Sequence, residues 1–222
     1  MRQVCLFIGE GDSERYFFPK ILETKEFVSL NQKQGIISIY QKEDIFWFFP
    51  FPPNLGNHIS GKERLKKPET YRLASLYAKN CAYLFGEQYE IHLVVIFDTD
   101  GASSEDRKKN IMEAINKSGV DFKKIIIKPV FVEIESWYLA GLEEDFPFFI
   151  QNKKSEITKF ISSETSMEHC KEKFNDLIDL DKLIGATDIS QAVAENFNEE
   201  KAIKYSKSYK DFNNELRRNG FF

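Results

Sequence analysis

The chain of 222 residues contains few of the residues from which several common active sites are built. It has 3 histidines and 3 cysteines; the cysteines are far apart in the sequence and none belongs to a CxxC pair. A disulfide framework, a zinc site and histidine-based catalysis are therefore not expected. Cys170 follows His169 directly, but neighbouring residues of a helix point about 100° apart. This pair is therefore not expected to be a thiol–imidazole site.

A long apolar run is also missing. The longest runs, at 93–97 and in the aromatic stretch at 46–51, fall well short of the roughly 18 residues that a membrane-spanning helix needs. The opening residues, MRQVCLFIGEGDSE, become acidic too early for a secretory signal. These absences lead us to expect a soluble, cytoplasmic protein.

An excess of positive charge is absent as well, because 31 basic and 35 acidic residues give a net charge of −4. This balance does not favour a generally cationic nucleic-acid binder. It is compatible with an acidic metal site combined with a local basic patch. The 42% of hydrophobic residues is enough for a packed core, and the length suits one domain or one domain with a small appendage.

Apolar runs and helical patterns alternate over residues 1–142. Buried strands are predicted at 3–9, 35–40, 91–97 and in the first part of 123–141. Helices are predicted after residue 11, at 68–87, at 104–117 and from about 135. This order predicts an α/β domain with a mostly parallel sheet. Residues 143–222 are predicted to form a helical C-terminal extension, with helices at 153–162, 166–180, 188–195 and 199–217.

A segment at 43–67 interrupts this alternation. It combines a run of aromatic residues at 46–51 with several prolines and glycines, which predicts irregular structure. Two interpretations of the aromatic residues stay open at this point. They either form an exposed protein-binding surface or plug the segment into the core.

Carboxylates follow the ends of three predicted strands. In an open parallel sheet, ligands bind outside the carboxyl ends of the strands, and carboxylate oxygens suit Mg²⁺ or Mn²⁺. Taken singly, an acid here can also be a turn residue or a solvated helix residue. Together they predict a site for one or two ions, formed by Glu10, Glu14, Asp98, Asp100, Glu133 and Glu135.

These motifs resemble the TOPRIM domain, the metal-binding domain of topoisomerases, primases and nucleases of the overcoming-lysogenization-defect type. The resemblance rests on the turn GEGDSE and on the strand VVIFDTD. The segment FVEIESWYLAG and the tail KAIKYSKSYKDFNNELRRNG are similar to small TOPRIM-like proteins of bacterial phage-defence loci. The resemblance implies a Rossmann-like fold and a metal-dependent nuclease that works with an ABC-type or AAA-type ATPase partner.

The resemblance also implies roles for individual residues. Glu10 would be a metal ligand or general acid/base, and Asp98 and Asp100 would hold Mg²⁺. Glu14 with Glu133 or Glu135 would hold a second ion. Such nucleases use a downstream lysine as well, for which the candidates are Lys153, Lys154, Lys171, Lys173 and Lys210.

Two other functions remain open. VVIFDTDGA also resembles the first motif of haloacid-dehalogenase phosphatases, although that motif normally opens the fold and here forms the third strand. The chain would alternatively be a non-catalytic TOPRIM-like binding subunit of an ATPase complex. A basic cluster is the candidate nucleic-acid contact, and nothing in it separates DNA from RNA. It consists of Lys62, Arg64, Lys66 and Lys67.

Overall fold

A six-stranded sheet forms the centre of the protein, with the strand order β2-β3-β4-β1-β5-β6. The structure is a computed structural model that describes residues 1–30, 37–50, 60–99, 103–150, 153, 169–179 and 189–222. Strands β4, β1, β5 and β6 run parallel, and β3 and β2 continue the sheet in antiparallel fashion. The strands are β1 Arg2–Ile8, β2 Val28–Ser29, β3 Ile37–Lys42, β4 Ile45–Pro50, β5 Tyr89–Asp98 and β6 Lys124–Val130. The predicted α/β class with a mostly parallel sheet is confirmed, and the arrangement is compatible with a Rossmann-like fold.

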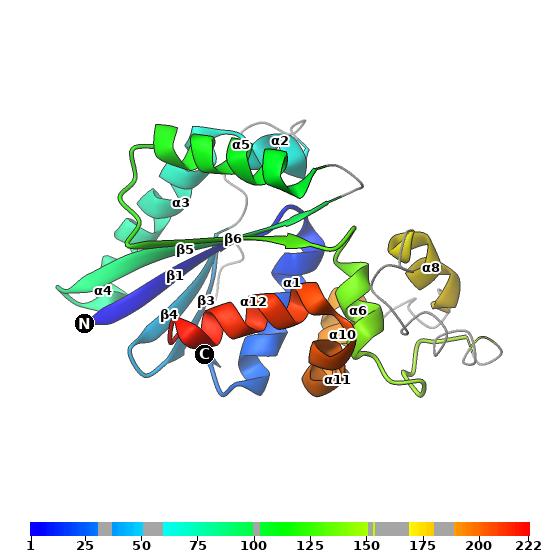
Figure 1. Ribbon diagram of the computed structural model, residues 1–222. Helices are drawn as coiled ribbons and strands as arrows, with labels where there is room; N and C mark the ends of the chain where they lie inside the picture. Colours follow the sequence, from blue (N-terminus) through cyan, green and yellow to red (C-terminus); the bar gives the residue numbers. More distant parts are fainter. Residues whose placement is uncertain (31–36, 51–59, 100–102, 151–152, 154–168, 180–188) are drawn as a thin grey trace.

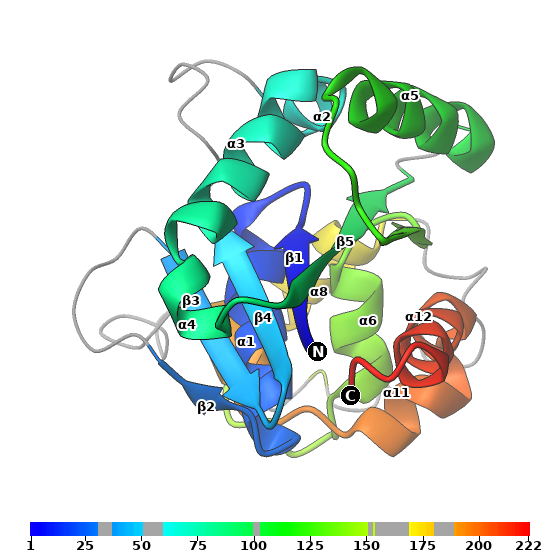
Figure 2. The same ribbon diagram turned by 90° about the vertical axis from the view of Figure 1, so that its left-hand side faces the viewer.

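Helices cover both faces of the sheet (Figures 1 and 2). One face carries α2 Gly61–Leu65, α3 Pro68–Asn80, α4 Ala82–Phe85 and α5 Ser104–Lys117. On the other face lie α1 Asp12–Thr24 and α12 Lys207–Arg218. Next to these two helices pack α6 Glu135–Gly141, α8 Cys170–Leu177, α10 Ile189–Glu195 and α11 Glu199–Tyr205.

The central strands are buried on both faces. In β1, Val4 and Leu6 point into the core beneath α3 and α5, whereas Cys5 and Phe7 point into the core beneath α1 and α12. All four side chains are at most 2% exposed. Successive residues of a strand point to opposite faces, so two covered faces require an unbroken apolar run of this kind.

The prediction of irregular structure at 43–67 is wrong for residues 61–65, which form α2, and for residues 45–50. These residues form β4, which pairs in parallel with β1 at the middle of the sheet. Its aromatic residues 46–49 are at most 1% exposed. Of the two interpretations of these side chains, the core is therefore correct and an exposed binding surface is wrong. The remainder of the aromatic run, at 51, lies outside the described residues.

Several predicted helices are found, with changed boundaries. The helix at 104–117 is confirmed as α5. The single helix predicted at 199–217 is instead α11 and α12, because the Ser206 side chain accepts the Tyr209 N–H and starts a new helix. The helix predicted at 68–87 is likewise divided, at Cys81. The predicted helix at 153–162 lies outside the described residues apart from Lys153.

The parallel strands place three chain segments at one edge of the sheet. β1 ends at Ile8, β5 at Asp98 and β6 at Val130, and β1 lies beside β5, which lies beside β6. The end of the chain packs against the sheet face that carries α1 and α12, where the indole N–H of Trp47 donates to the Phe221 carbonyl at 3.0 Å. Among the described residues, no helix is both long and apolar enough to cross a membrane.

Candidate functional site

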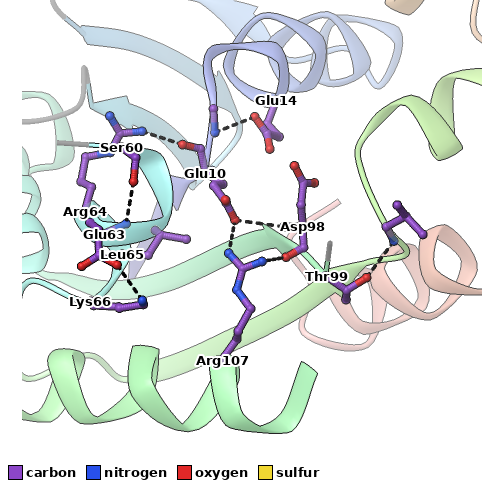
Figure 3. A network of polar contacts seen from close by, with 12 residues as sticks. Glu10, Glu14, Ser60, Glu63, Arg64, Leu65, Lys66, Asp98, Thr99 and Arg107 are labelled. Carbon is purple, nitrogen blue, oxygen red and sulfur yellow. Dashed lines mark hydrogen bonds and ion pairs between the residues drawn. The ribbon is translucent and has the colours of Figure 1, made fainter. Parts of the chain in front are cut away.

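Glu10 and Asp98 meet at the carboxyl ends of β1 and β5. The strands pair in parallel up to Ile8 and Val95, so the residues that follow them emerge side by side. The backbone N–H of Asp98 donates to Glu10 Oε2 at 3.1 Å, and the Glu10 residue is 6% exposed. The turn after the first strand is thus joined to the end of β5 by a buried carboxylate (Figure 3).

Arg107, from the first half of α5, binds both of these residues. Its Nη2 lies 2.6 Å from Glu10 Oε2, and its Nη1 donates to the Asp98 carbonyl oxygen. The guanidinium also lies 5.2 Å from the centre of the Phe97 ring. The side chains of Arg107 and Glu10 are only 13% and 7% exposed, so this pair is a buried one. Arg107 could not be predicted from the sequence, because nothing in a charged helix distinguishes it from its basic neighbours.

Glu14 lies one helical turn after Glu10 and is 1% exposed. Its Oε2 accepts the N–H of Gly11 at 3.0 Å. Burial is the main reason that the pKa of the Glu14 carboxyl is raised to about 7. The nearby carboxylates of Glu10 and Glu135 contribute to the rise, and hydrogen bonds from the backbone N–H groups of Glu14 and Gly11 oppose it. Gly9 makes room for this side chain, since a Cβ atom there would lie 2.8 Å from the Cβ of Glu14.

The start of α2 packs against the backbone of Glu10. Arg64 Nη2 donates to the Glu10 carbonyl oxygen at 2.8 Å (Figure 3). A Cβ atom at Gly61 would lie 1.9 Å from the same oxygen, so only glycine fits there. Gly61 therefore permits the close approach that lets Arg64 hold the turn.

Glu133 and Glu135 follow β6. The Thr99 Oγ1 accepts the N–H of Val132 at 2.8 Å, which ties the segment after β6 to the segment after β5. Glu135 is the first residue of α6. Burial raises the pKa of its carboxyl, and the neighbouring Glu133 adds to the rise.

Cys170, at the start of α8, closes the cluster from the other side. Its Sγ lies 3.9 Å from Glu133 Oε2. Burial raises the pKa of this thiol to about 12, with further contributions from Glu133, Glu135 and Asp98. Its neighbour His169 is exposed. Cys170 is therefore close enough to these three carboxylates for their charges to affect its thiol.

The structure therefore brings most of the predicted acidic residues together. Glu10 and Asp98 are in direct contact, Glu14 and Glu135 interact electrostatically, and Glu133 adjoins Cys170. Asp100 lies outside the described residues.

The basic residues singled out in the sequence are spread more widely. In the 62–67 cluster, Arg64 reaches the site, and Lys66 pairs with Glu63 at 2.7 Å. Lys62 and Lys67 are exposed. Among the candidate catalytic lysines, Lys153 donates to the Asp176 carbonyl and Lys154 lies outside the described residues. The others are exposed on α8 and α12, at Lys171, Lys173 and Lys210.

The donor chemistry of this cluster suits a hard divalent cation. Its acidic side chains offer carboxylate oxygens, which Mg²⁺ and Mn²⁺ prefer. Burial is the main cause of the raised pKa of Glu14 and of Glu135, and a bound cation would favour their charged forms. Within the described ranges, no three histidine, cysteine or acidic side chains are arranged to hold a metal ion. Arg107 instead supplies positive charge to Glu10. Binding of an ion would therefore require some rearrangement of these side chains.

Comparison with known proteins does not assign the chain to a family. No protein-family model matches the sequence, and no curated protein matches it. The residues of the site are thus the basis for a functional proposal.

Proposed function

We propose that this protein is a cytoplasmic, metal-dependent nuclease of the TOPRIM type, the effector of a phage-defence system that includes an ABC-type or AAA-type ATPase. The observation that carries the proposal is the contact between Glu10 and the Asp98 backbone at 3.1 Å. It joins the two motifs on which the TOPRIM resemblance depends, the glutamate turn and the DxD strand end, at one edge of a parallel sheet.

The buried acids support a division of roles. Mg²⁺ or Mn²⁺ held by Glu10, Asp98 and Asp100, with a second ion at Glu14 and Glu133 or Glu135, would stabilise charge on the phosphodiester and its leaving oxygen. Glu10 would either complete the site of the first ion or shuttle the proton. Arg107 orients the Glu10 carboxylate, and Arg64 fixes the backbone that carries it.

One observation favours the alternative, a non-catalytic binding subunit of an ATPase complex. Arg107 already neutralises Glu10 in the described structure. The ion pair with Arg107 can stabilise this part of the acidic cluster in the folded protein without a metal ion. The two functions differ in whether added metal ions produce cleavage.

The test is a cleavage assay on plasmid, single-stranded DNA and transfer RNA, with Mg²⁺, Mn²⁺ or EDTA, and with and without a candidate ATPase partner. We expect wild-type protein to cleave only with a metal ion, and Asp98→Ala to abolish cleavage while the fold is retained. Glu135→Ala should reduce cleavage less if one ion is sufficient, and equally if two are needed. Asp121→Ala is a matched control, because Asp121 is exposed and precedes β6, away from the acidic cluster.

Cleavage that survives EDTA or Asp98→Ala would contradict the mechanism. Wild-type protein that is inert on every nucleic acid, even with its partner, would favour the binding subunit.

A further inference from the structure

A cavity of about 400 Å³ lies against β6, the last strand of the sheet. It is bounded by β6 and by the beginnings of α5 and α12, which lie on opposite faces of that strand (Figure 1). Thr99, the residue directly after Asp98, is part of its wall. A ligand in this cavity would therefore lie next to the proposed cleavage site.

Three lysines from three different elements line the cavity. They are Lys108 from α5, Lys128 from β6 and Lys207 from α12. Hydroxyl groups line the same space, as do two carboxylates, Glu105 and Asp211. Ammonium and hydroxyl donors together are the groups that contact the phosphates and sugars of nucleic acids. The hydroxyl residues are Thr99, Ser104 and Ser208.

Two of these lysines take part in ion pairs of different kinds. Lys128 lies 2.5 Å from Glu215 and its side chain is 26% exposed, so its position is fixed by the fold. Lys207 pairs with Asp211 one turn further along α12, and its side chain is 79% exposed. An exposed pair of this kind contributes about 0–1 kcal/mol, so Lys207 can exchange this partner for a phosphate at little cost.

The remaining wall is apolar and comes from alternate residues of β6 and its continuation. Ile127, Pro129 and Phe131 all line the cavity. Ile127 belongs to the core beneath α5 and Phe131 packs against the core beneath α12, so the cavity reaches both faces of this edge strand. Phe131 is half-buried and lines the cavity. An aromatic ring beside basic groups is the combination by which proteins bind unpaired bases.

Resting on the proposed function, we infer that this cavity holds one nucleotide of a single-stranded nucleic acid, next to the phosphate that is cleaved. Its volume lies at the small-molecule end of the roughly 300–1,000 Å³ found for ligand sites. A base within an intact duplex is stacked and paired and cannot enter such a space. The substrate class of the enzyme is therefore single-stranded DNA or RNA.

The experiment measures binding rather than cleavage. The full-length Asp98→Ala protein is titrated, by fluorescence anisotropy in EDTA, against labelled oligothymidylate, oligouridylate and a blunt duplex of equal length. The same titrations are made after adding Lys108→Glu with Lys207→Glu. The control pair is Lys109→Glu with Lys117→Glu, which makes the same change in net charge at exposed positions of α5 outside the cavity.

We expect a single strand to bind more tightly than the duplex, and the cavity pair to weaken its binding roughly tenfold or more relative to the control pair. The slope of log K against log salt should also fall by about 0.7 for each phosphate of the single strand that the substituted side chains no longer neutralise. Phe131→Ala should weaken binding by roughly tenfold, because a base no longer stacks on the ring, without changing that slope.

Equal weakening by the two lysine pairs, or tighter binding of the duplex, would overturn the inference. The same experiments distinguish failure of this inference from failure of the proposed nuclease function. If the lysine effect is found but the protein with Asp98 intact never cleaves with Mg²⁺ or Mn²⁺, the nucleotide cavity stands and the nuclease does not. If that protein cleaves and the cavity pair changes neither binding nor cleavage, the nuclease stands and the cavity inference fails.

Discussion

The carboxylate of Glu10 accepts the backbone N–H of Asp98 at 3.1 Å, although the two residues are 88 positions apart in the sequence. Arg107 binds the same carboxylate oxygen at 2.6 Å. A single buried oxygen atom therefore connects the glutamate turn, the end of β5 and helix α5. A substitution in any one of these three segments should therefore alter the position or stability of the other two.

The first prediction concerns the cation of this network. Arg107→Gln should lower the free energy of unfolding by roughly 3 kcal/mol in EDTA, because it leaves Glu10 buried without its counter-charge. Mg²⁺ or Mn²⁺ should restore part of the loss, since an ion bound only by the folded state stabilises that state. Urea unfolding with and without metal provides the measurement.

Lys109→Gln serves as the control for Arg107→Gln, because it removes a positive charge from an exposed position of the same helix. An Arg107→Gln protein as stable as this control would show that the buried pair contributes nothing. A destabilised variant on which metal ions have no effect would favour the non-catalytic interpretation.

The second prediction concerns pH and Glu14. Its pKa in the folded protein is about 7, against an ordinary value of 4.5, so folding favours the protonated carboxyl. Stability from this group is complete below about pH 4.5 and is lost as the pH rises through 7. In EDTA at pH 8, Glu14→Gln should therefore be more stable than wild type by up to about 3 kcal/mol.

The comparison for Glu14→Gln is a pair of unfolding curves at pH 5 and pH 8. The gain should nearly vanish at pH 5, and Glu113→Gln, at an exposed position of α5, should change little at either pH. A gain that is the same at both values would mean that ionisation of Glu14 is not its cause.

A third prediction tests the close approach at Gly61. A methyl group there would meet the Glu10 carbonyl oxygen at 1.9 Å, so Gly61→Ala should force α2 away from the turn. The expected cost is about 1–3 kcal/mol, as for other overpacked positions. Thermal unfolding measures it, with the exposed neighbour substitution Lys62→Ala as the control. Equal melting temperatures for the two variants would contradict the packing described for α2.

The fourth prediction concerns His92, which is 5% exposed and packs against the ring of Phe221 at 4.9 Å. Neither ring nitrogen has a hydrogen-bond partner among the described residues. Burial lowers the pKa of His92, and Lys124 and Lys123 lower it further against the effect of Glu90.

Because the folded state disfavours charged His92, its contribution to stability is complete above the unfolded pKa of about 6.5 and is lost as the pH falls. His92→Leu should therefore reduce the loss of stability between pH 7 and pH 5. His169→Asn is the control, since His169 is exposed. The idea fails if His92→Leu and wild type lose stability in parallel over this range.

The sequence predicted the parts of the fold in which periodicity is clear. Helix α5 and strand β5 follow the apolar patterns from which they were predicted. Strand β4 was missed because a central strand covered on both faces shows no alternation, and the prolines beside it resembled a loop. Pro50 in fact stands at the end of this strand, where a missing N–H is tolerated.

The acidic part of the site could be predicted from the sequence because it depends on strands that were predicted. Glu10 and Asp98 directly follow apolar strands, and the ends of parallel strands must lie at one edge. The roles of Arg107 and Gly61 could not be predicted, because they depend on where a helix from another part of the chain approaches the turn. Charge and composition carry no information about that approach.

The pairing of β1 with β5 also has a consequence for synthesis of the protein on the ribosome. Gln3 of β1 lies opposite Glu90 of β5. Strand β1 therefore cannot pair with β5, one of its two neighbours, until the ribosome has synthesised β5. Contacts this distant in sequence form slowly, and an apolar strand that waits for its partner is prone to aggregate. The same delay means that no unfinished chain lacking residue 98 can assemble the Glu10 site. A site built in this way stays incomplete until at least 98 of the 222 residues have been translated.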